Sequence, residues 1–202
     1  NSSSDQGESN ADRLTNQDRV NITLTNILPG YSGLIYIDDG VTKTKIDSGF
    51  FTPGQEGITF DVPTAQTGTY TYTTVHIDTA GNRSGFSDPI IISVDRDAPS
   101  AALTYEDDAL VRSGDISTLV TFTFSEPMDS VNVPTIDVLY PDPTGTVRLS
   151  GVELVESGNG DDIWTFSIPL DGDDYNTLNG TFILSVTAND MAGNTISSED
   201  IT

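Results

Sequence analysis

The chain has 202 residues, a net charge of −23 and no cysteine. Its length suits one or two domains. The lack of cysteine excludes disulfide bonds and thiolate metal sites, and the negative charge disfavours binding to nucleic acid or to anionic membranes. No apolar run approaches the roughly 18 residues that span a bilayer, so we expect no membrane insertion by this segment.

The acidic residues are concentrated in the second half of the chain. Residues 1–97 contain 13 acidic and 6 basic side chains, whereas residues 98–202 contain 18 acidic and 2 basic ones. One explanation is a solvated acidic surface. Another is that some carboxylates gather divalent cations, because hard cations such as Ca²⁺ prefer oxygen ligands. The two explanations are compatible, and the composition leaves both open.

The first half of the chain begins with a polar segment and continues as short alternating runs. Residues 1–17 contain one leucine and are interpreted as a leader or linker. In the next run, Val20, Ile22 and Leu24 share one face. The later runs are SGLIYIDDG, GITFDV, TGTYTYTTVHID and SDPIIISVD. Short strands bounded by Gly, Pro, Asn or Asp are typical of sandwiches, so we predict a β-sandwich over residues 18–95.

The second half repeats this plan. The run STLVTFTFSEPM places Val120, Phe122 and Phe124 on one face, and we expect Trp164 and Phe166 to anchor the core. The other runs are TIDVLY, TVRLSGVELVE, DIWTFSIPL and GTFILSVTAND. The stretch VDRDAPS lies between the two halves and is interpreted as a short, stiff linker. The sequence therefore predicts an all-β fold of two tandem sandwiches, the second over residues 96–202.

The motif Asp-x-Ala-Gly-Asn occurs twice, beginning at Asp78 and at Asp190. Each copy follows an alternating strand, as a hairpin loop does. Gly81 and Gly193 supply a positive φ, and the aspartates accept hydrogen bonds from loop amides as in an Asx turn. A turn alone explains the motif. The alternative is that the repeated aspartate is a metal ligand.

The alternation of the strands supports that alternative for the second copy. Asp190 continues the core-facing side of its strand, and Glu126 does the same after Phe124. If these strands lie in opposite sheets and end at the same pole, the linker residues Asp95 and Asp97 arrive there too. Clustered carboxylates repel one another and favour a bound cation. We therefore predict a Ca²⁺ site formed by these four acidic residues.

Three stretches, VDRDAPS, VTFTFSEPM and VTANDMAGN, together resemble the bacterial immunoglobulin-like repeats found in tandem in large secreted adhesins and other surface proteins. The resemblance covers nearly all of residues 95–202 and implies an immunoglobulin-like sandwich. Several members of the family bind Ca²⁺ at interdomain junctions. The resemblance therefore implies the same role for Asp95, Asp97, Glu126 and Asp190.

The first half departs from that pattern. Its stretch IDTAGNRSGFSD is more similar to a strand and loop of fibronectin type III domains. Asn26 stands where the second domain has Glu126, and no D-x-x-A-P stretch precedes it, although Asp18 is close by. Asp78 is therefore favoured as a turn residue over a metal ligand.

Nothing in the sequence predicts an enzyme. His76 is the only histidine and lies within a strand, and no G-x-S-x-G or H-E-x-x-H motif is present. The fragments GNGDD (residues 158–162) and LDGDD (residues 170–174) lack the ligand spacing of an EF-hand and are interpreted as polar turns.

The sequence thus predicts a monomeric extender or stalk segment of an extracellular or cell-surface adhesin-like protein. Its partners would be neighbouring repeat domains of a longer chain from which this segment is cut, and Ca²⁺ would rigidify the interdomain junction. The alternative is a carbohydrate- or ligand-binding accessory module of a secreted enzyme or surface protein, with a glycan or host-surface ligand. The aromatic residues available for that role are Tyr31, Tyr36, Tyr70, Tyr72, Phe50 and Phe51.

Overall fold

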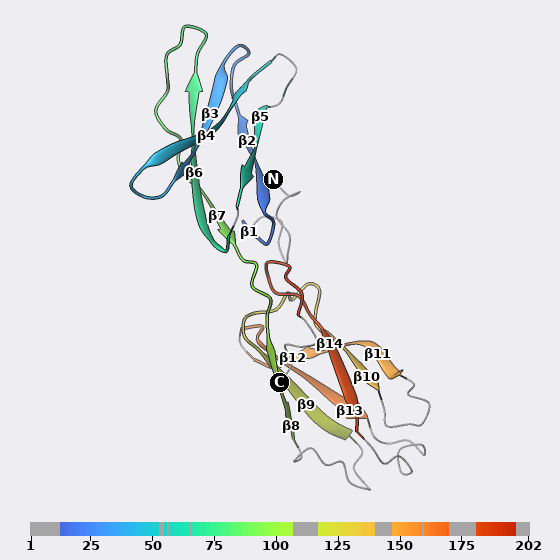
Figure 1. The fold of residues 1–202 in the computed structure, drawn as a ribbon. Helices are drawn as coiled ribbons and strands as arrows, with labels where there is room; N and C mark the ends of the chain where they lie inside the picture. Colours follow the sequence, from blue (N-terminus) through green and yellow to red (C-terminus); the bar gives the residue numbers. More distant parts are fainter. Residues whose placement is uncertain are drawn as a thin grey trace. The chain divides into compact units, whose positions relative to one another are not determined.

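The computed structural model divides the chain into two compact units, Asn1–Asp97 and Ala98–Thr202 (Figure 1). Every regular element among the described residues is a β-strand, so the prediction of an all-β fold is confirmed. The structure describes residues 13–52, 55, 57–64, 66–106, 117–139, 147–158, 160–169 and 181–196.

The first unit contains a large and a small sheet. The large sheet has the strand order β1-β7-β6-β3-β4, and the small sheet pairs β2 with β5. All pairings are antiparallel except that of β1 with β7, which is parallel. The strands are β1 (Leu14–Thr15), β2 (Arg19–Thr25), β3 (Ser32–Asp38), β4 (Lys43–Phe50), β5 (Gly57–Pro63), β6 (Gly68–Ile77) and β7 (Ile90–Val94).

The core of the first unit is formed by residues that alternate along these strands, as the period of a β-strand requires. Val20 and Ile22 of β2 are buried, and Leu24 packs against the same cluster, as the sequence predicted. Tyr72 of β6 and Ile35 of β3 are fully buried in it. Burial raises the pKa of the Tyr72 hydroxyl to about 12, and this hydroxyl donates to the carbonyl oxygen of Pro63.

A smaller apolar cluster lies on the other face of the large sheet. Leu34 and Tyr36 of β3 alternate with the core residues of that strand, and they pack with Val75 of β6. The ring of Phe86 meets Tyr36 edge to face, with 5.2 Å between ring centroids, and Arg83 donates a hydrogen bond to the Tyr36 hydroxyl. The segment after β6 therefore partly covers this second cluster.

The second unit has the strand arrangement of an immunoglobulin-like sandwich. One sheet has the order β12-β13-β9-β8 and the other the order β11-β10-β14. In chain order the first sheet corresponds to strands D, E, B and A. In the second sheet β10 and β14 correspond to C and F, and β11 adds a strand beside C, where constant-type domains have none. The strands are β8 (Ala101–Tyr105), β9 (Ser117–Phe124), β10 (Thr135–Leu139), β11 (Val147–Glu153), β12 (Val155–Glu156), β13 (Ile163–Pro169) and β14 (Ile183–Thr187).

The core of the second unit follows the predicted faces. Val120, Phe122 and Phe124 of β9 are buried, and Trp164 of β13 lies in the same cluster. The indole N–H of Trp164 donates a hydrogen bond to the carbonyl oxygen of Asp161 at 2.8 Å, so the polar group of the buried ring has a partner. Phe166 is only partly buried and packs against the cluster.

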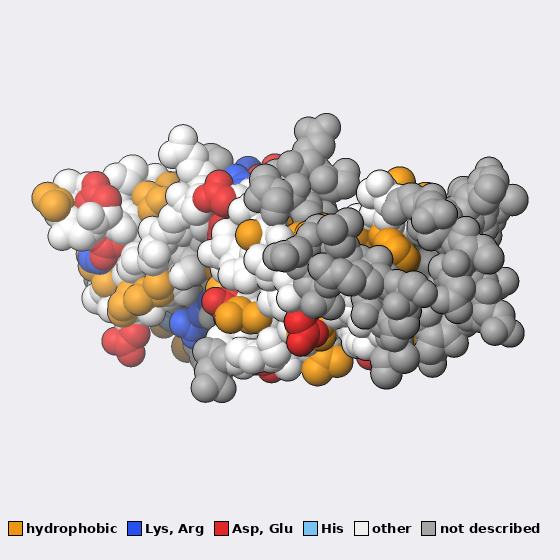
Figure 2. All heavy atoms as spheres, turned by 90° about the horizontal axis from the view of Figure 1, so that it is seen from below, with side chains coloured by type: hydrophobic (Ala, Val, Ile, Leu, Met, Phe, Trp, Pro, Cys, Tyr) orange, Lys and Arg blue, Asp and Glu red, His pale blue; other side chains and the backbone are white. Residues whose placement is uncertain are grey.

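Acidic side chains on the face drawn in Figure 2 are scattered among polar atoms, as on a solvated surface.

Part of the segment interpreted from sequence as a leader belongs to the first sandwich. Leu14 pairs with Ser93, and Thr15 pairs with Val94. Thr15 is 1% exposed. A strand of two residues carries no visible alternation, so the sequence offered no pattern by which to recognise it. Residues 1–12 lie outside the described part of the chain.

Candidate metal centre

The two Asp-x-Ala-Gly-Asn loops have the same hydrogen bonds. In the first, Asp78 Oδ1 accepts from the backbone N–H groups of Ala80 and Asn82 at 2.9 and 2.8 Å. Its Oδ2 accepts from Asn82 Nδ2 at 2.8 Å. Gly81 has φ of +88°, in the region that glycine adopts without strain. The Asx turn predicted from the sequence therefore forms.

The second loop matches the first closely. Asp190 Oδ1 accepts from the N–H groups of Ala192 and Asn194, both at 2.8 Å. Asp190 Oδ2 accepts from Asn194 Nδ2 at 2.8 Å, and Gly193 has φ of +89°. The local sequence thus determines the loop conformation, and any difference in role between the copies comes from their surroundings.

The surroundings of the two aspartates differ sharply. Asp78 is partly exposed, and the amide groups of Asn82, first the side chain and then the backbone, hold its pKa below the usual value. Asp190 is 1% exposed. A carboxylate that has left water must be compensated by hydrogen bonds, by a cation or by both.

Three acidic residues come together around Asp190. One carboxylate oxygen from each of Asp95, Glu126 and Asp190 lies within 4.8 Å of the others. Two oxygens that each lie about 2.3–2.6 Å from one Ca²⁺ are separated by no more than about 5 Å. This cluster of three acidic residues therefore has a spacing that could hold a metal ion.

The loops after β9 and β14 are joined by backbone contacts, which explains why Glu126 and Asp190 meet. Met128 and Asp190 form an isolated antiparallel bridge, and the N–H of Asp129 donates to the carbonyl oxygen of Asn189 at 2.8 Å. Because β9 and β14 belong to different sheets, these contacts close one end of the second sandwich. Glu126 lies in the loop that they fasten.

The hydrogen bonds of Asp190 leave room for a further partner. A carboxylate has about four lone-pair positions. The two backbone amides and the Asn194 side chain use three of them. One position is therefore left for a cation, and the turn and the ligand roles are compatible in the same side chain.

Asp95 lies in the segment after β7, where its N–H donates to the carbonyl oxygen of Thr15 at 3.0 Å. Asp97, the fourth residue predicted as a ligand, lies outside the group of three. Its side chain is exposed, and its N–H donates to Asp95 Oδ1 at 3.0 Å. Asp97 thus supports the Asp95 carboxylate through its backbone.

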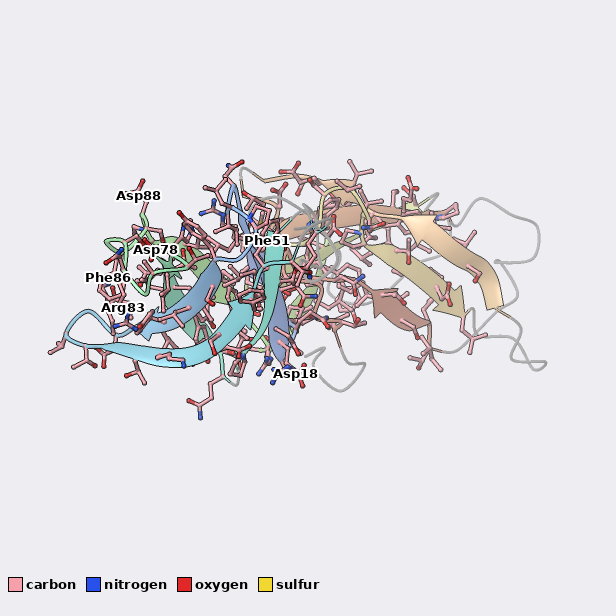
Figure 3. All side chains as sticks on the ribbon, turned by 90° about the horizontal axis from the view of Figure 1, so that it is seen from above. Asp18, Phe51, Asp78, Arg83, Phe86 and Asp88 are labelled. Carbon is pink, nitrogen blue, oxygen red and sulfur yellow. The ribbon has the colours of Figure 1, made fainter. Side chains whose placement is uncertain are left out.

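Asp78 and Asp18, the two acidic residues considered in the first unit, are well apart (Figure 3). Asp78 follows the last residue of β6. The carbonyl oxygen of Asp18 accepts from Thr64, which precedes the opposite end of β6. Asn26 has φ of +58° and carries no carboxylate. The part of the chain that the structure describes shows no counterpart of the three-residue cluster in the first unit.

Asp129 is a structural residue that the sequence analysis missed. It is 1% exposed, and its Oδ1 accepts from the N–H groups of Val131 and Asn132 at 2.8 and 3.0 Å. Its Oδ2 accepts from Asn132 Nδ2 at 2.7 Å. The signal was an Asp-x-x-Asn sequence directly after FSEPM. This further Asx turn, formed by Asp129, stabilises the loop that carries Glu126.

Most of the aromatic residues proposed for ligand binding are in apolar clusters. Tyr72, Phe51 and Tyr36 are buried, and Tyr31 and Tyr70 pack against the core. Phe50 is 58% exposed. Phe86, labelled in Figure 3, is 51% exposed. The alternative function therefore loses most of the aromatic surface that the sequence had suggested for it.

One of the two acidic fragments, GNGDD, is largely described by the structure. In GNGDD, Asp161 has φ of +56°, and its carbonyl oxygen accepts from Met128 and from the Trp164 ring, so it acts as a turn. The fragment LDGDD lies outside the described residues. No helix among the described residues is long and apolar enough to cross a membrane.

No family model matches the chain, and no curated protein matches it. Among solved structures, the chain is similar to a tetra-tandem repeat in the extending region of a large adhesion protein, with 16% identity and a TM-score of 0.36. That match covers 89% of this chain and 43% of the other, so the chain spans less than half of that structure.

The chain is also similar to fibronectin(III)-like modules of CbhA from Clostridium thermocellum, with 21% identity and a TM-score of 0.39. This match covers 91% of this chain and 83% of the other. Both descriptions agree with the two families that the sequence resembles. At TM-scores below 0.5, neither likeness supports a conclusion about function.

Proposed function

We propose that this chain is a structural extender segment of an extracellular or cell-surface adhesin-like protein, and that Ca²⁺ bound by Asp95, Glu126 and Asp190 rigidifies its interdomain junction. The observation that carries the proposal is the approach of three carboxylate oxygens to within 4.8 Å of one another. The proposed role is mechanical and non-catalytic, and its partners are the neighbouring domains of the same chain.

The electrostatics of the cluster support a divalent cation. Three carboxylates carry a formal charge of −3, and Asp190 is almost fully removed from water. Such groups repel one another, and a positive charge placed among them relieves that repulsion. Arg96 follows Asp95 in the sequence, but the Arg96 guanidinium donates to backbone carbonyl oxygens of the first unit. A divalent cation would supply positive charge at the cluster itself.

The choice of Ca²⁺ over Mg²⁺ follows from the donor set. Ca²⁺ accepts six to eight oxygens in flexible geometry, whereas Mg²⁺ demands near-octahedral coordination and gives up its water reluctantly. Three carboxylates on separate loops, completed by backbone oxygens or water, match the first description. Asp97 would stabilise the site through its N–H bond to Asp95.

The proposal predicts a rise in Tm on adding Ca²⁺ to the chain after EDTA treatment. At 100 times its Kd, a ligand adds about 2.7 kcal/mol of stability, which corresponds to a rise in Tm of about 10 °C for a unit of about 100 residues. Scanning calorimetry of the wild type with EDTA, Ca²⁺ or Mg²⁺ measures it, and Mg²⁺ should give the smaller shift.

Two variants locate the effect. E126Q removes one ligand charge from a partly exposed position and should weaken Ca²⁺ binding at least about tenfold by isothermal titration. D78N removes the matched aspartate from the first unit's loop and should leave both Ca²⁺ affinity and the Tm shift unchanged. The metal role is wrong if Ca²⁺ does not move the Tm, or if E126Q and D78N respond to it equally.

A further inference from the structure

We propose that residues 13–17 and 93–96 of the first unit form a shear clamp, locked by the side chain of Arg96, that resists unfolding when the chain is pulled from its two ends. The clamp does not depend on the cation site or on the adhesin assignment. It is an inference about how this unit responds to force.

The topology of the first unit places its two ends side by side. β1 is close to the start of the described chain and β7 is the last strand of the unit, and the two pair in parallel. Tension applied to the chain before β1 and after β7 therefore pulls the paired strands past each other in opposite directions. In that geometry the bonds between the strands are loaded together, whereas bonds in a peeled pair break one after another.

Backbone hydrogen bonds form the first part of the clamp. The N–H of Ser93 donates to the carbonyl oxygen of Arg13 at 2.9 Å, and the N–H of Asp95 donates to that of Thr15 at 3.0 Å. Thr15 is almost fully buried, so water has little access to replace the second of these bonds. A pair of this length would be weak by itself.

Arg96 extends the clamp beyond the strands. Its Nε donates to the carbonyl oxygen of Asn16 at 3.0 Å, and its Nη2 donates to that of Gln17 at 2.6 Å. The same Nη2 donates to the carbonyl oxygen of Thr64, and the backbone N–H of Arg96 donates to Thr67 Oγ1 at 3.1 Å. Hydrogen bonds from a charged donor are about twice as strong as neutral ones.

The acceptors of Arg96 connect the clamp to both sheets. Asn16 and Gln17 follow β1 of the large sheet, whereas Thr64 follows β5 of the small sheet. The Thr64 hydroxyl is buried and donates to the carbonyl oxygen of Gln17 at 2.6 Å. Pulling β7 out of the sheet therefore requires Arg96 to leave three carbonyl acceptors at once, those of the partly buried Asn16 and Gln17 and of the buried Thr64. This places Arg96 at the point where force first acts.

The chain is well suited to a direct test because it contains no cysteine. The substitutions N1C and D97C, at a terminal and at an exposed position, provide two unique attachment points and load only the first unit. In this background, R96A is compared with R19A. Arg19 bonds Asp61 across the small sheet at 2.7 Å and lies outside the line between the pulled ends.

Under constant force in optical tweezers, R96A should unfold at least about tenfold faster than the parent, and R19A should stay within about twofold of it. A core variant, V62A, separates force resistance from ordinary stability, because Val62 is buried on the small sheet. V62A should be destabilised in urea yet accelerate less under force than R96A, since forced unfolding depends on the unfolding rate along the pulled direction.

The clamp is overturned if R96A and R19A unfold at the same rate under force, or if the rates of all variants simply follow their stability in urea. If R96A does not fold, R96K serves in its place. A lysine keeps the charge but cannot hold the Nε and Nη2 contacts together, so it should show the same ranking with a smaller acceleration.

Discussion

The loops that begin at Asp78 and Asp190 have the same five-residue pattern, the same turn hydrogen bonds and nearly the same glycine φ, yet within the part of the chain that the structure describes only the second belongs to an acidic cluster. The difference is outside the loops. Asp190 is buried, and Asp95 and Glu126 approach it, whereas Asp78 is partly exposed and bonds within its own turn. The comparison shows that the motif specifies the conformation of the loop. The surrounding residues decide whether the loop also belongs to a candidate ligand set.

The largest expected difference between the loops is in stability without metal. D190A removes the acceptor of the Ala192 and Asn194 amides in a buried setting, and each buried donor left unpaired costs about 1–3 kcal/mol. We expect a loss of about 2–4 kcal/mol for the second unit, measured by urea denaturation in EDTA. D78A is the matched control and should cost the first unit clearly less, because water can reach the freed amides. Equal losses would mean that burial does not distinguish the loops.

A smaller effect on stability tests whether the two loops have the same backbone conformation. G81A and G193A each place a Cβ on a residue with φ near +90°, and a left-handed conformation costs an L-residue about 1–2 kcal/mol. A Cβ added at Gly81 would meet no atom within 4 Å, so its cost there is backbone strain alone. We expect similar losses of about 1–2 kcal/mol in the two units. Urea midpoints for each unit measure this, and a much larger loss for G193A would show that packing around the second loop adds to the strain.

The smallest effect concerns pH. Hydrogen bonds from Asn82 lower the pKa of Asp78 below its ordinary value of 3.8. A depressed folded-state pKa adds stability above the unfolded value, and this contribution is lost as the pH falls through the folded value. The first unit should therefore lose less stability between pH 6 and pH 3 in D78N than in the wild type. Urea midpoints at the two pH values measure the difference, and parallel curves for the two proteins would contradict it.

Much of this arrangement follows from alternation in the sequence. The core faces of β2, β9 and β14 were predicted because one side of each strand is apolar and the other polar. The same alternation placed Glu126 and Asp190 on the core side at the ends of their strands. It could not choose between Asp95 and Asp97, because residues two apart share a face. That choice depends on the turn in which Asp97 donates its N–H to Asp95.

Other features left no pattern to detect. The strand β1 has two residues and is held through backbone atoms that every residue carries. Arg96 binds carbonyl oxygens of Asn16, Gln17 and Thr64, and a carbonyl acceptor has no signature in the sequence. The second apolar cluster of the first unit was hidden for the opposite reason. Its strands β3 and β6 are apolar on both faces, so alternation did not identify the side that packs against the small sheet.

The hydrogen bonds that shape the Asp-x-Ala-Gly-Asn loop join residues within the five, and Asp and Asn bond each other through side chain and backbone. Such a loop is stabilised by its own hydrogen bonds wherever it follows a β-strand. It can therefore keep the same conformation whether it is exposed to water or packed against a core. Mutations in the surrounding protein can then place or remove neighbouring carboxylates without redesigning the turn, which offers a simple route by which one copy gains a ligand set and another remains a connector.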